Sequence, residues 1–420
     1  MMKFTRALTA TILLGCLAVV WRQSVAADWP GWRGSDRTGL CRETGLLASW
    51  PEGGPKLLWN IEGVGEGYST PSIVNGVLFV MGNRDGQEQV IAWDVKKEPR
   101  ELWAATLGPV RHDGAGYPGP RCTPTFDKGK LYALGLNGDL VCLNARDGKL
   151  IWRRDLVGEL GGAVPNWGYS ESPLVAGNWV LCTPGGSRAT IAALNKQTGA
   201  TIWESPVSDG AAYSSIIPAR LTGRDQFVQF TARGVIGVAA SDGKFLWRWD
   251  APANGTANCS TPIAVGEDHI FAASGYGTGG GVVEIKSAGD AVTADEVYFT
   301  KDMKNHHGGV ILLNGFLFGS NDPGLLTCLD ANTGKVKWRD RSCGKGSLLY
   351  ADGHFYVRSE EGLVSLVEAT PDGFHLKGRF EQPDRTGAPS WPHPVIADGR
   401  LFLRDQNRLL CYGIRSDEGS

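Results

Sequence analysis

The chain has 420 residues, with 42 Lys and Arg against 44 Asp and Glu, so its formal net charge is −2. This balance excludes the strongly basic surface that nucleic-acid-binding proteins use for phosphate contacts. Glycine accounts for 58 residues without the every-third spacing of collagen, which indicates a chain rich in tight turns.

The first 27 residues are typical of an export signal. Lys3 and Arg6 precede an apolar run over residues 7–21, and small residues follow at 25–27. A membrane span needs about 20 apolar residues, and neither this run nor any other is long enough. We therefore predict cleavage near Ala27, no transmembrane segment, and an exported protein that is periplasmic or extracellular. An alternative is a lipid anchor on Cys16, because LLGC at 13–16 is similar to a bacterial lipobox.

Residues 28–54 precede the repeats and form an N-terminal extension. Its DWPGWRG sequence places Trp29 and Trp32 close together. Because these large apolar rings favour burial, we expect them to pack the extension against the side or the base of the domain that follows.

Residues 55–415 contain a unit of about 46 residues that repeats eight times. Each unit closes with a turn and an aromatic residue, as in CLNARDGKLIW at 142–152 and CLDANTGKVKW at 328–338. Strand-favouring residues alternate between these markers, and helical periodicity is absent. The units open at Pro71, Pro124, Pro173, Ile217, Pro262, Val310, Leu348 and Pro394.

This pattern predicts an all-β, eight-bladed β-propeller of four-stranded antiparallel blades. Residues 55–63 supply one strand ahead of the first opening, and the last unit supplies only three strands before Ile414. We expect the N-terminal strand to complete the last blade and so remove exposed sheet edges. Residues 416–420 then form a C-terminal tail.

Two residue types in the repeat are interpreted as structural. The closing tryptophans are expected at the seams between blades, where the ring N–H finds a backbone acceptor. Cys142, Cys328 and Cys411 occupy the same position of different units. We interpret them as small buried core side chains rather than disulfide partners.

The repeat A-x-[DN]-x-x-[TD]-G-x-x-x-W resembles that of the bacterial quinoprotein (PQQ-repeat) propellers, with four good copies and about three degenerate ones across nearly the whole mature chain. DWPGWRG and NHHGGVILLNGFLFG are similar to secreted PQQ-binding-like repeat proteins. The resemblance implies an eight-bladed propeller, shared by quinoprotein alcohol dehydrogenases and BamB-like lipoproteins. It also implies that a dehydrogenase would carry an adjacent cysteine pair over the quinone, and this chain has no adjacent cysteines and no CxxCH haem motif.

The segments just before each opening are expected to converge on one face of the ring, with the turns after each second strand. They form a polar and aromatic funnel around the axis, which suits a protein or a small polar ligand. The alternative is a solvated rim whose charges pair with one another. The predicted ligand-binding residues are Tyr68, Arg121, Tyr169, Glu171, Tyr213, Asn305, His306, His307, Lys345, Glu360, Trp391, His393 and Arg404.

No metal site is assigned at this point. Neighbouring residues of an extended segment point to opposite sides, so His306 and His307 are not expected to share one metal. A site that combines one of them with His393 or Glu171 is the alternative, without a known ligand spacing in its favour.

The sequence therefore favours an exported, non-catalytic binding propeller with no catalytic residues. One alternative is a dehydrogenase dependent on PQQ and calcium, with Arg121, Glu171, Lys345 and Trp391 as cofactor contacts. Another is a BamB-like scaffold for outer-membrane assembly that binds partner chains along strand edges or loop tips.

Overall fold

The structure, a computed structural model, describes residues 27–111 and 116–416. The predicted export signal up to residue 26 and the lipobox at Cys16 lie outside these residues. The described residues form 32 strands and no helix. No helix of the length and apolar character that a bilayer span requires is therefore present in this part of the chain.

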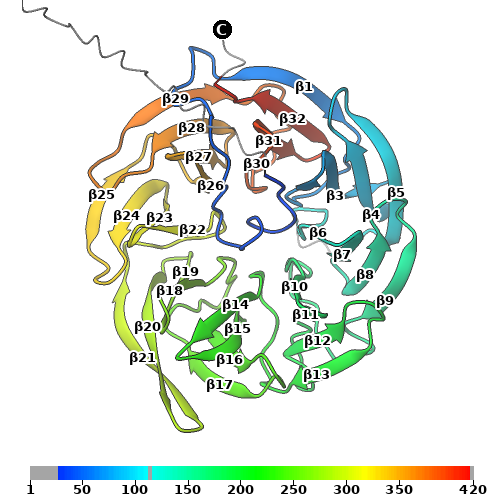
Figure 1. Cartoon of the computed structure of the whole chain (residues 1–420), viewed down its shortest axis with the longest axis vertical. Helices are drawn as coiled ribbons and strands as arrows, with labels where there is room; N and C mark the ends of the chain where they lie inside the picture. Colours follow the sequence, from blue (N-terminus) through cyan, green and yellow to red (C-terminus); the bar gives the residue numbers. More distant parts are fainter. Residues whose placement is uncertain (1–26, 112–115, 417–420) are drawn as a thin grey trace, which may run out of the picture.

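The strands form eight antiparallel sheets of four strands each, arranged as blades around an axis (Figure 1), which confirms the predicted eight-bladed propeller. Blades 1 to 4 consist of β2 Ser72–Val74, β3 Val77–Arg84, β4 Gln87–Asp94 and β5 Arg100–Pro109; β6 Thr125–Asp127, β7 Lys130–Leu134, β8 Asp139–Asn144 and β9 Leu150–Asp155; β10 Leu174–Ala176, β11 Trp179–Cys182, β12 Ile191–Asn195 and β13 Thr201–Ser205; and β14 Ile217–Leu221, β15 Arg224–Phe230, β16 Val235–Ala239 and β17 Phe245–Trp249.

Blades 5 to 8 repeat the same order from the axis outward. They consist of β18 Ile263–Val265, β19 His269–Ser274, β20 Gly279–Ala288 and β21 Ala291–Thr300; β22 Val310–Leu313, β23 Phe316–Asn321, β24 Leu325–Asp330 and β25 Val336–Asp340; β26 Gly346–Ala351, β27 His354–Ser359, β28 Leu363–Glu368 and β29 Leu376–Glu381; and β30 Val395–Ala397, β31 Arg400–Asp405 and β32 Arg408–Gly413, joined by β1 Lys56–Glu62.

The N-terminal strand closes the ring, as predicted. β1 pairs antiparallel with β32, with Lys56 opposite Gly413 and Glu62 opposite Arg408. Figure 1 shows the two strands side by side at the top of the ring, where the blue and red ends of the colour scale meet. Backbone hydrogen bonds between the two ends of the chain therefore hold the last blade together.

The seams between blades explain why the repeat carries both a glycine and a tryptophan. Trp103 of blade 1 donates its ring N–H to the carbonyl of Ala145 in blade 2 at 3.2 Å, and Trp152 reaches Lys196 of blade 3 in the same way at 3.1 Å. Each ring also covers the turn glycine of the next blade. A Cβ added at Gly148 would lie 2.5 Å from Trp103. The glycine is required by this contact as well as by its positive φ of 71°.

The cysteines are buried as predicted. Cys142, Cys328 and Cys411 are each 0% exposed and belong to the hydrophobic core between blades. All eight cysteines of the described residues are free thiols.

The first part of the N-terminal extension, up to Cys41, lies in the axial channel rather than at the side or the base of the ring. The second part runs along blades 7 and 8, where the amide of Leu47 donates to Ile414 and that of Trp50 donates to Lys377 of β29. Figure 1 shows the dark-blue trace of the first part running across the centre of the ring. Trp29 pairs with Ile73 of β2, and the amide of Phe126 in β6 donates to the carbonyl of Pro30. The amide of Cys41 donates to the carbonyl of Tyr350 in β26, and the amide of Tyr350 donates to Gly39. The inner strands leave backbone groups facing the axis, and the extension satisfies them.

Two buried arginines of the extension tie it to further blades. Arg37 donates to the carbonyls of Ser172 and Ile216, just before β10 and β14, at 2.9 Å each. Arg33 donates to Val310 in β22. Trp32 donates its ring N–H to Thr261, just before β18, and Cys41 contacts Ile396 of β30. Together with the strand contacts above, these bonds connect the extension to the inner region of all eight blades.

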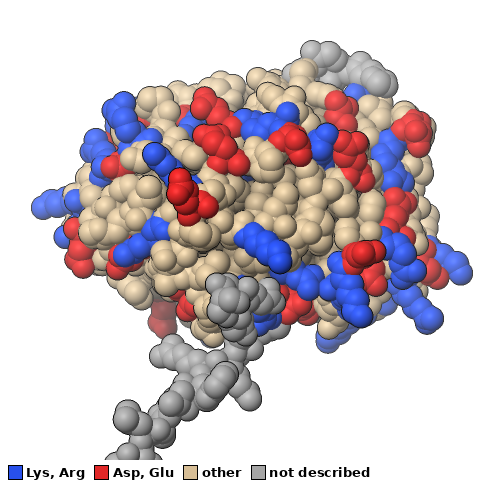
Figure 2. Space-filling model, turned by 90° about the horizontal axis from the view of Figure 1, so that it is seen from above, with Lys and Arg blue, Asp and Glu red and all other residues tan. Residues whose placement is uncertain are grey.

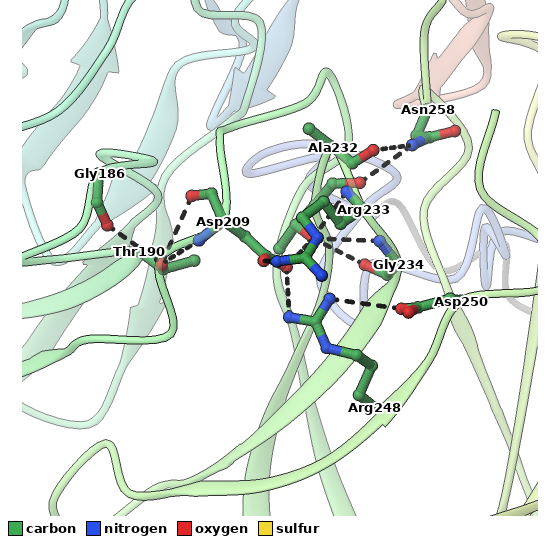
Figure 3. A network of polar contacts seen from close by, with 10 residues as sticks. Gly186, Thr190, Asp209, Ala232, Arg233, Gly234, Arg248, Asp250 and Asn258 are labelled. Carbon is green, nitrogen blue, oxygen red and sulfur yellow. Dashed lines mark hydrogen bonds and ion pairs between the residues drawn. The ribbon is translucent and has the colours of Figure 1, made fainter. Parts of the chain in front are cut away.

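A polar network joins the loops of blades 3 and 4 (Figure 3). The side chain of Asp209 is fully buried and accepts hydrogen bonds from Thr231 at 2.6 Å and from Arg248 at 2.7 Å. Thr190 of blade 3 donates its hydroxyl to the carbonyl of Asp209 and accepts from its amide. This buried carboxylate is satisfied by hydroxyl and guanidinium donors and therefore serves the contact between the blades.

Charges of both signs lie on the side of the molecule that Figure 2 shows. Figure 2 shows Lys and Arg interspersed with Asp and Glu around this side of the molecule, with apolar and neutral surface between them. Such mixing leaves little net field over this face to steer a highly charged partner.

Candidate functional site: the axial cavity

A cavity of about 210 Å³ opens where the segments before the inner strands meet around the axis. We call it the axial cavity. Its lining is mostly aromatic, with a few hydroxyl and charged groups. The lining residues are Trp32, Tyr68, Thr70, Tyr117, Arg121, Trp167, Ser170, Tyr213, Ser215, Ala257, Cys259, Tyr276, His306, His307, Trp391 and His393.

The extension supplies Trp32 to the lining, where the ring contacts His393. The two ring centroids are 4.6 Å apart. Burial, together with the nearby Arg33, lowers the pKa of His393 to about 3, so its imidazole is neutral at physiological pH. Its Nε2 lies 3.0 Å from the carbonyl of His307, so this nitrogen carries the proton and donates. Because the extension occupies the channel, we expect the cavity to be closed on that side.

Trp391 is the centre of the aromatic wall. Its ring centroid lies 4.8 Å from that of Tyr68 and 4.7 Å from that of Tyr117. Its ring N–H donates to Glu360 Oε1 at 2.9 Å, which fixes the orientation of the indole. Arg121 lies 5.7 Å from the ring centroid of Tyr68 and donates to the carbonyls of Trp167 and Tyr117. The wall is therefore held by polar contacts before any ligand arrives.

A cluster of charged groups supports the wall beside Trp391. Glu360 Oε1 lies 2.6 Å from His307 Nε2 and 3.6 Å from Lys345 Nζ, and Lys345 also contacts Asp322 at 3.3 Å. Burial opposes ionisation of Glu360, but His307, Lys345 and the Trp391 N–H outweigh it and lower the pKa of Glu360 to about 2. Glu360 is therefore a carboxylate at neutral pH.

His306 is the neutral member of this cluster. Burial, then His307 and Lys345, lower the pKa of His306 to about 3. The Lys345 ammonium lies 2.9 Å from Nδ1, which must accept because an ammonium only donates. Nε2 then carries the proton and donates to the Tyr276 hydroxyl at 3.0 Å. The fixed tautomer orients Tyr276 at the cavity.

The two neighbouring histidines face the same cluster, which corrects the expectation from an extended segment. Their ring centroids are 5.0 Å apart, because the chain bends at residues 306–308 instead of forming a strand. With Glu360 they bring three potential ligand atoms within 4.8 Å of one another. The Lys345 ammonium already provides a positive charge beside these atoms. His307 Nδ1 is buried there without a hydrogen-bond partner, and we assign the cluster no metal.

The structure brings together seven of the thirteen predicted residues in the lining of the cavity. These are Tyr68, Arg121, Tyr213, His306, His307, Trp391 and His393. Lys345 and Glu360 lie directly behind them, in contact with the histidines. That this set binds a ligand stays a prediction.

The other four predicted residues are buried within the blades. Tyr169 donates to the carbonyl of Pro184, and Glu171 accepts from the amide of Thr183. Asn305 donates to two backbone carbonyls, and Arg404 donates to four. Tyr169, Glu171 and Asn305 lie before an opening, as predicted, whereas Arg404 lies within the second strand β31 and not in the turn after it. Their side chains turn into the blades, because buried backbone groups there need partners.

Four aromatic lining residues were not predicted. Trp32 comes from the extension, and Tyr117 and Trp167 come from connections between blades. Tyr276 lies in the glycine-rich turn between β19 and β20. Its φ is 54°. The only sequence signal for this position was an aromatic residue inside the glycine cluster SGYGTGGG.

The described residues fit PQQ with calcium poorly. Calcium requires six to eight oxygen ligands, usually from several carboxylates. At the axial cavity the nearby carboxylates of Glu360 and Asp322 are already paired with Lys345, and Glu171 is buried inside a blade. Of the four residues suggested as cofactor contacts, only Arg121 and Trp391 line the cavity.

Relatives of the chain include an assembly factor and an alcohol dehydrogenase. Outer membrane protein assembly factor BamB of Shewanella oneidensis is 23% identical over 302 residues, which cover 69% of this chain and 72% of that protein. Quinoprotein alcohol dehydrogenase PedH of Pseudomonas putida is 28% identical over 186 residues, 42% of this chain. That match spans only 29% of the dehydrogenase.

Solved structures share the fold at low sequence identity. BamB from Moraxella catarrhalis matches with a TM-score of 0.60 and 15% identity, covering 86% of this chain and 98% of that one. Quinohemoprotein alcohol dehydrogenase from Comamonas testosteroni matches with a TM-score of 0.66 and 12% identity, covering 93% and 80%. Residues 98–340, more than half of the chain, match the family model described as outer membrane protein assembly factor BamB. The chain therefore belongs to this family of PQQ-repeat, BamB-like β-propellers.

Proposed function

We propose that the protein is an exported, non-catalytic binding propeller that holds one ring-shaped polar group in the axial cavity. The observation that carries the proposal is the lining itself. Aromatic faces surround a volume of about 210 Å³, and hydroxyl and imidazole groups stand among them. This volume is below the ~300–1,000 Å³ of pockets for drug-sized ligands, so it suits a single ring.

The charge of the site supports a neutral or weakly charged ligand. The Glu360 carboxylate is paired with the Lys345 ammonium and contacts His307, and Arg121 donates to backbone carbonyls. A ligand would therefore gain mainly from ring contacts and from hydrogen bonds to groups such as the Tyr276 hydroxyl. The ring is either a free small molecule or a side chain at the tip of a partner loop.

A test uses the processed protein and a panel of ring compounds that includes monosaccharides, nicotinamide, N-acetyltryptophanamide, and PQQ with Ca²⁺. We expect at least one compound without PQQ to raise the Tm of the wild type and of Trp179→Ala, a control on β11 outside the cavity lining. Trp391→Ala should lose that response. A bound chromophore with dye-linked alcohol oxidation would instead establish a dehydrogenase and refute the proposal.

A second candidate, a BamB-like assembly scaffold, is favoured by the family match and by an apolar belt on the outer strands. The residue before the closing aromatic points to solvent in five blades, because side chains alternate along a strand. The belt residues are Leu58, Leu102, Ile151, Ile202 and Val297. Outer strands with unpaired edges can add an extended partner segment.

The belt and the cavity can be separated experimentally. If the scaffold function holds, an envelope protein will be retained by the wild type and by Trp391→Ala. Retention will fall when Ile151 and Ile202 are both replaced by Ser. If the partner instead inserts a ring into the cavity, Trp391→Ala will abolish retention and the belt variant will keep it.

A further inference from the structure

The first described residue, Ala27, makes a contact that bears on how the chain is processed. Its backbone N–H donates to Glu43 Oε1 at 3.1 Å. Glu43 lies at the other end of the segment that crosses the channel, and it is 1% exposed. The same carboxylate accepts from the amides of Asp398 and Gly399, in the turn between β30 and β31. One buried group therefore joins the start of the extension to the last blade.

Glu43 has no ion-pair partner among the described residues. It makes three backbone hydrogen bonds, and Arg415 acts on it only as a nearby charge while its guanidinium bonds Asp398. Burial raises the pKa of Glu43 in spite of these interactions. A buried carboxylate with incomplete compensation favours any arrangement that places a positive charge beside it.

The sequence places a cleavage signal immediately before this contact. The basic start and the apolar run over residues 7–21 are followed, after Arg22 and Gln23, by the sequence SVAA at 24–27. Cleavage after Ala26 has Ser24 and Ala26 at the two positions where export peptidases require small side chains. Cleavage after Ala27 would place the larger Val25 at one of them.

We propose that an export peptidase cleaves between Ala26 and Ala27 and that the new amino terminus forms an ion pair with Glu43. The peptide bond between the Ala26 carbonyl carbon and the Ala27 nitrogen is hydrolysed. The hydroxyl of water becomes part of the Ala26 carboxyl group, and a proton of water goes to the Ala27 nitrogen. The α-amine has an ordinary pKa of about 8, so it takes up a further proton at neutral pH. The existing hydrogen bond then becomes charge-assisted and stronger.

The pairing gives processing a structural consequence. In the precursor the Ala27 nitrogen is a neutral amide, which offers Glu43 one hydrogen bond and no charge. In the processed chain it compensates the buried carboxylate and fastens the extension to the turn at Asp398. Cleavage one residue later, after Ala27, would remove the nitrogen that contacts Glu43. The ion pair therefore requires cleavage between Ala26 and Ala27.

The first test is the amino terminus of the exported protein. The full 420-residue precursor is expressed in an exporting bacterium, and the processed chain is analysed by intact mass and by N-terminal sequencing. We expect Ala27 as the first residue. A start at Asp28, or a lipid-modified Cys16 as the first residue, would overturn the proposal.

The second test measures the ion pair. The chain that begins at Ala27 is compared with one that carries Gly-Ser ahead of it, each with and without Glu43→Gln. The free-amine form should have a Tm higher by about 1–3 °C, and this difference should vanish in the Glu43→Gln pair. An equal difference with and without the substitution contradicts the pairing.

A third measurement needs no variant and applies if Glu43→Gln does not fold. An ion pair raises the pKa of the α-amine, so its reaction with an N-hydroxysuccinimide ester at pH 7.5 should be about tenfold slower than in a peptide of the same sequence. The modified N-terminal peptide is quantified by mass spectrometry. A rate equal to that of the peptide excludes the proposed contact.

Discussion

At the scale of single residues, Glu360 connects the structural and the ligand-facing parts of the cavity. One carboxylate oxygen contacts His307, Lys345 and Trp391. Because these partners favour the charged form, the pKa of Glu360 falls to about 2 from an ordinary 4.5. The stabilisation is therefore complete above about pH 4.5 and is lost as the pH falls towards 2.

We expect Glu360→Gln to lower the free energy of unfolding at pH 7 by on the order of 2 kcal/mol. The difference from the wild type should shrink as the pH is lowered from 5 to 2, because the native carboxylate is then protonated as well. Urea unfolding at a series of pH values measures this dependence. Glu361→Gln, at the exposed neighbouring position, is the matched control. A difference that does not change with pH would contradict the assigned charge.

At the scale of elements, the seam between blades depends on glycines that the preceding blade contacts. A Cβ at Gly243 would lie 2.4 Å from the Trp203 ring of blade 3, and its φ is 73°. Gly223 has a similar φ of 78°, but a Cβ there would meet nothing within 4 Å. Substitution of Gly223 therefore tests backbone strain alone, whereas substitution of Gly243 tests backbone strain together with the contact between blades.

We predict that Gly223→Ala lowers the free energy of unfolding by about 1 kcal/mol through backbone strain alone. Gly243→Ala should lower it by about 2–4 kcal/mol, because the added methyl also displaces Trp203. Equilibrium unfolding of both variants gives the comparison. Equal losses would mean that the tryptophan moves aside at no cost.

At the same scale, the repeat could be predicted from the sequence because each blade needs the same residue types at its closing turn and outer strand. The turn glycine and the tryptophan recur at fixed spacing, so the strand order and the closure by β1 followed from the pattern. The packing of the Trp103 ring against Gly148 could not be predicted from the repeat. The sequence pattern shows the turn within one unit, whereas this contact joins two units.

At the scale of the whole molecule, the extension is expected to be required for the stability of the ring. Its contacts reach the inner region of every blade, and Arg37 alone donates to the carbonyls of Ser172, Pro173 and Ile216. Deletion of residues 28–40 should therefore lower the Tm by at least about 5 °C or prevent folding.

Arg37→Gln is the milder companion of the deletion. This substitution leaves the extension in the channel but removes the positive charge of Arg37 and some of its N–H donors. We therefore expect a smaller fall in Tm than in the deletion. Differential scanning calorimetry measures both variants. An unchanged Tm in the deletion would show that the contacts in the channel contribute nothing.

The axial cavity was only partly predictable at this scale. The positions before each opening converge as expected, and they supply residues such as Trp391 and His307. Whether a side chain turns towards the axis or into its blade depends on local backbone partners, which is why Glu171 and Arg404 are buried. Trp32 could not be placed, because nothing in a non-repeating segment of sequence states that it crosses the channel.

The path of the extension also bears on how the architecture can vary over evolution. Propellers change size by duplicating or losing a unit, and an empty channel tolerates the new circumference. Here the extension has a separate partner on or just before each inner strand, so its contacts match one circumference of the channel. A ring of seven or nine units would leave Trp29, Arg33 or Arg37 without its acceptor, so the contacts of this extension fit a ring of eight units.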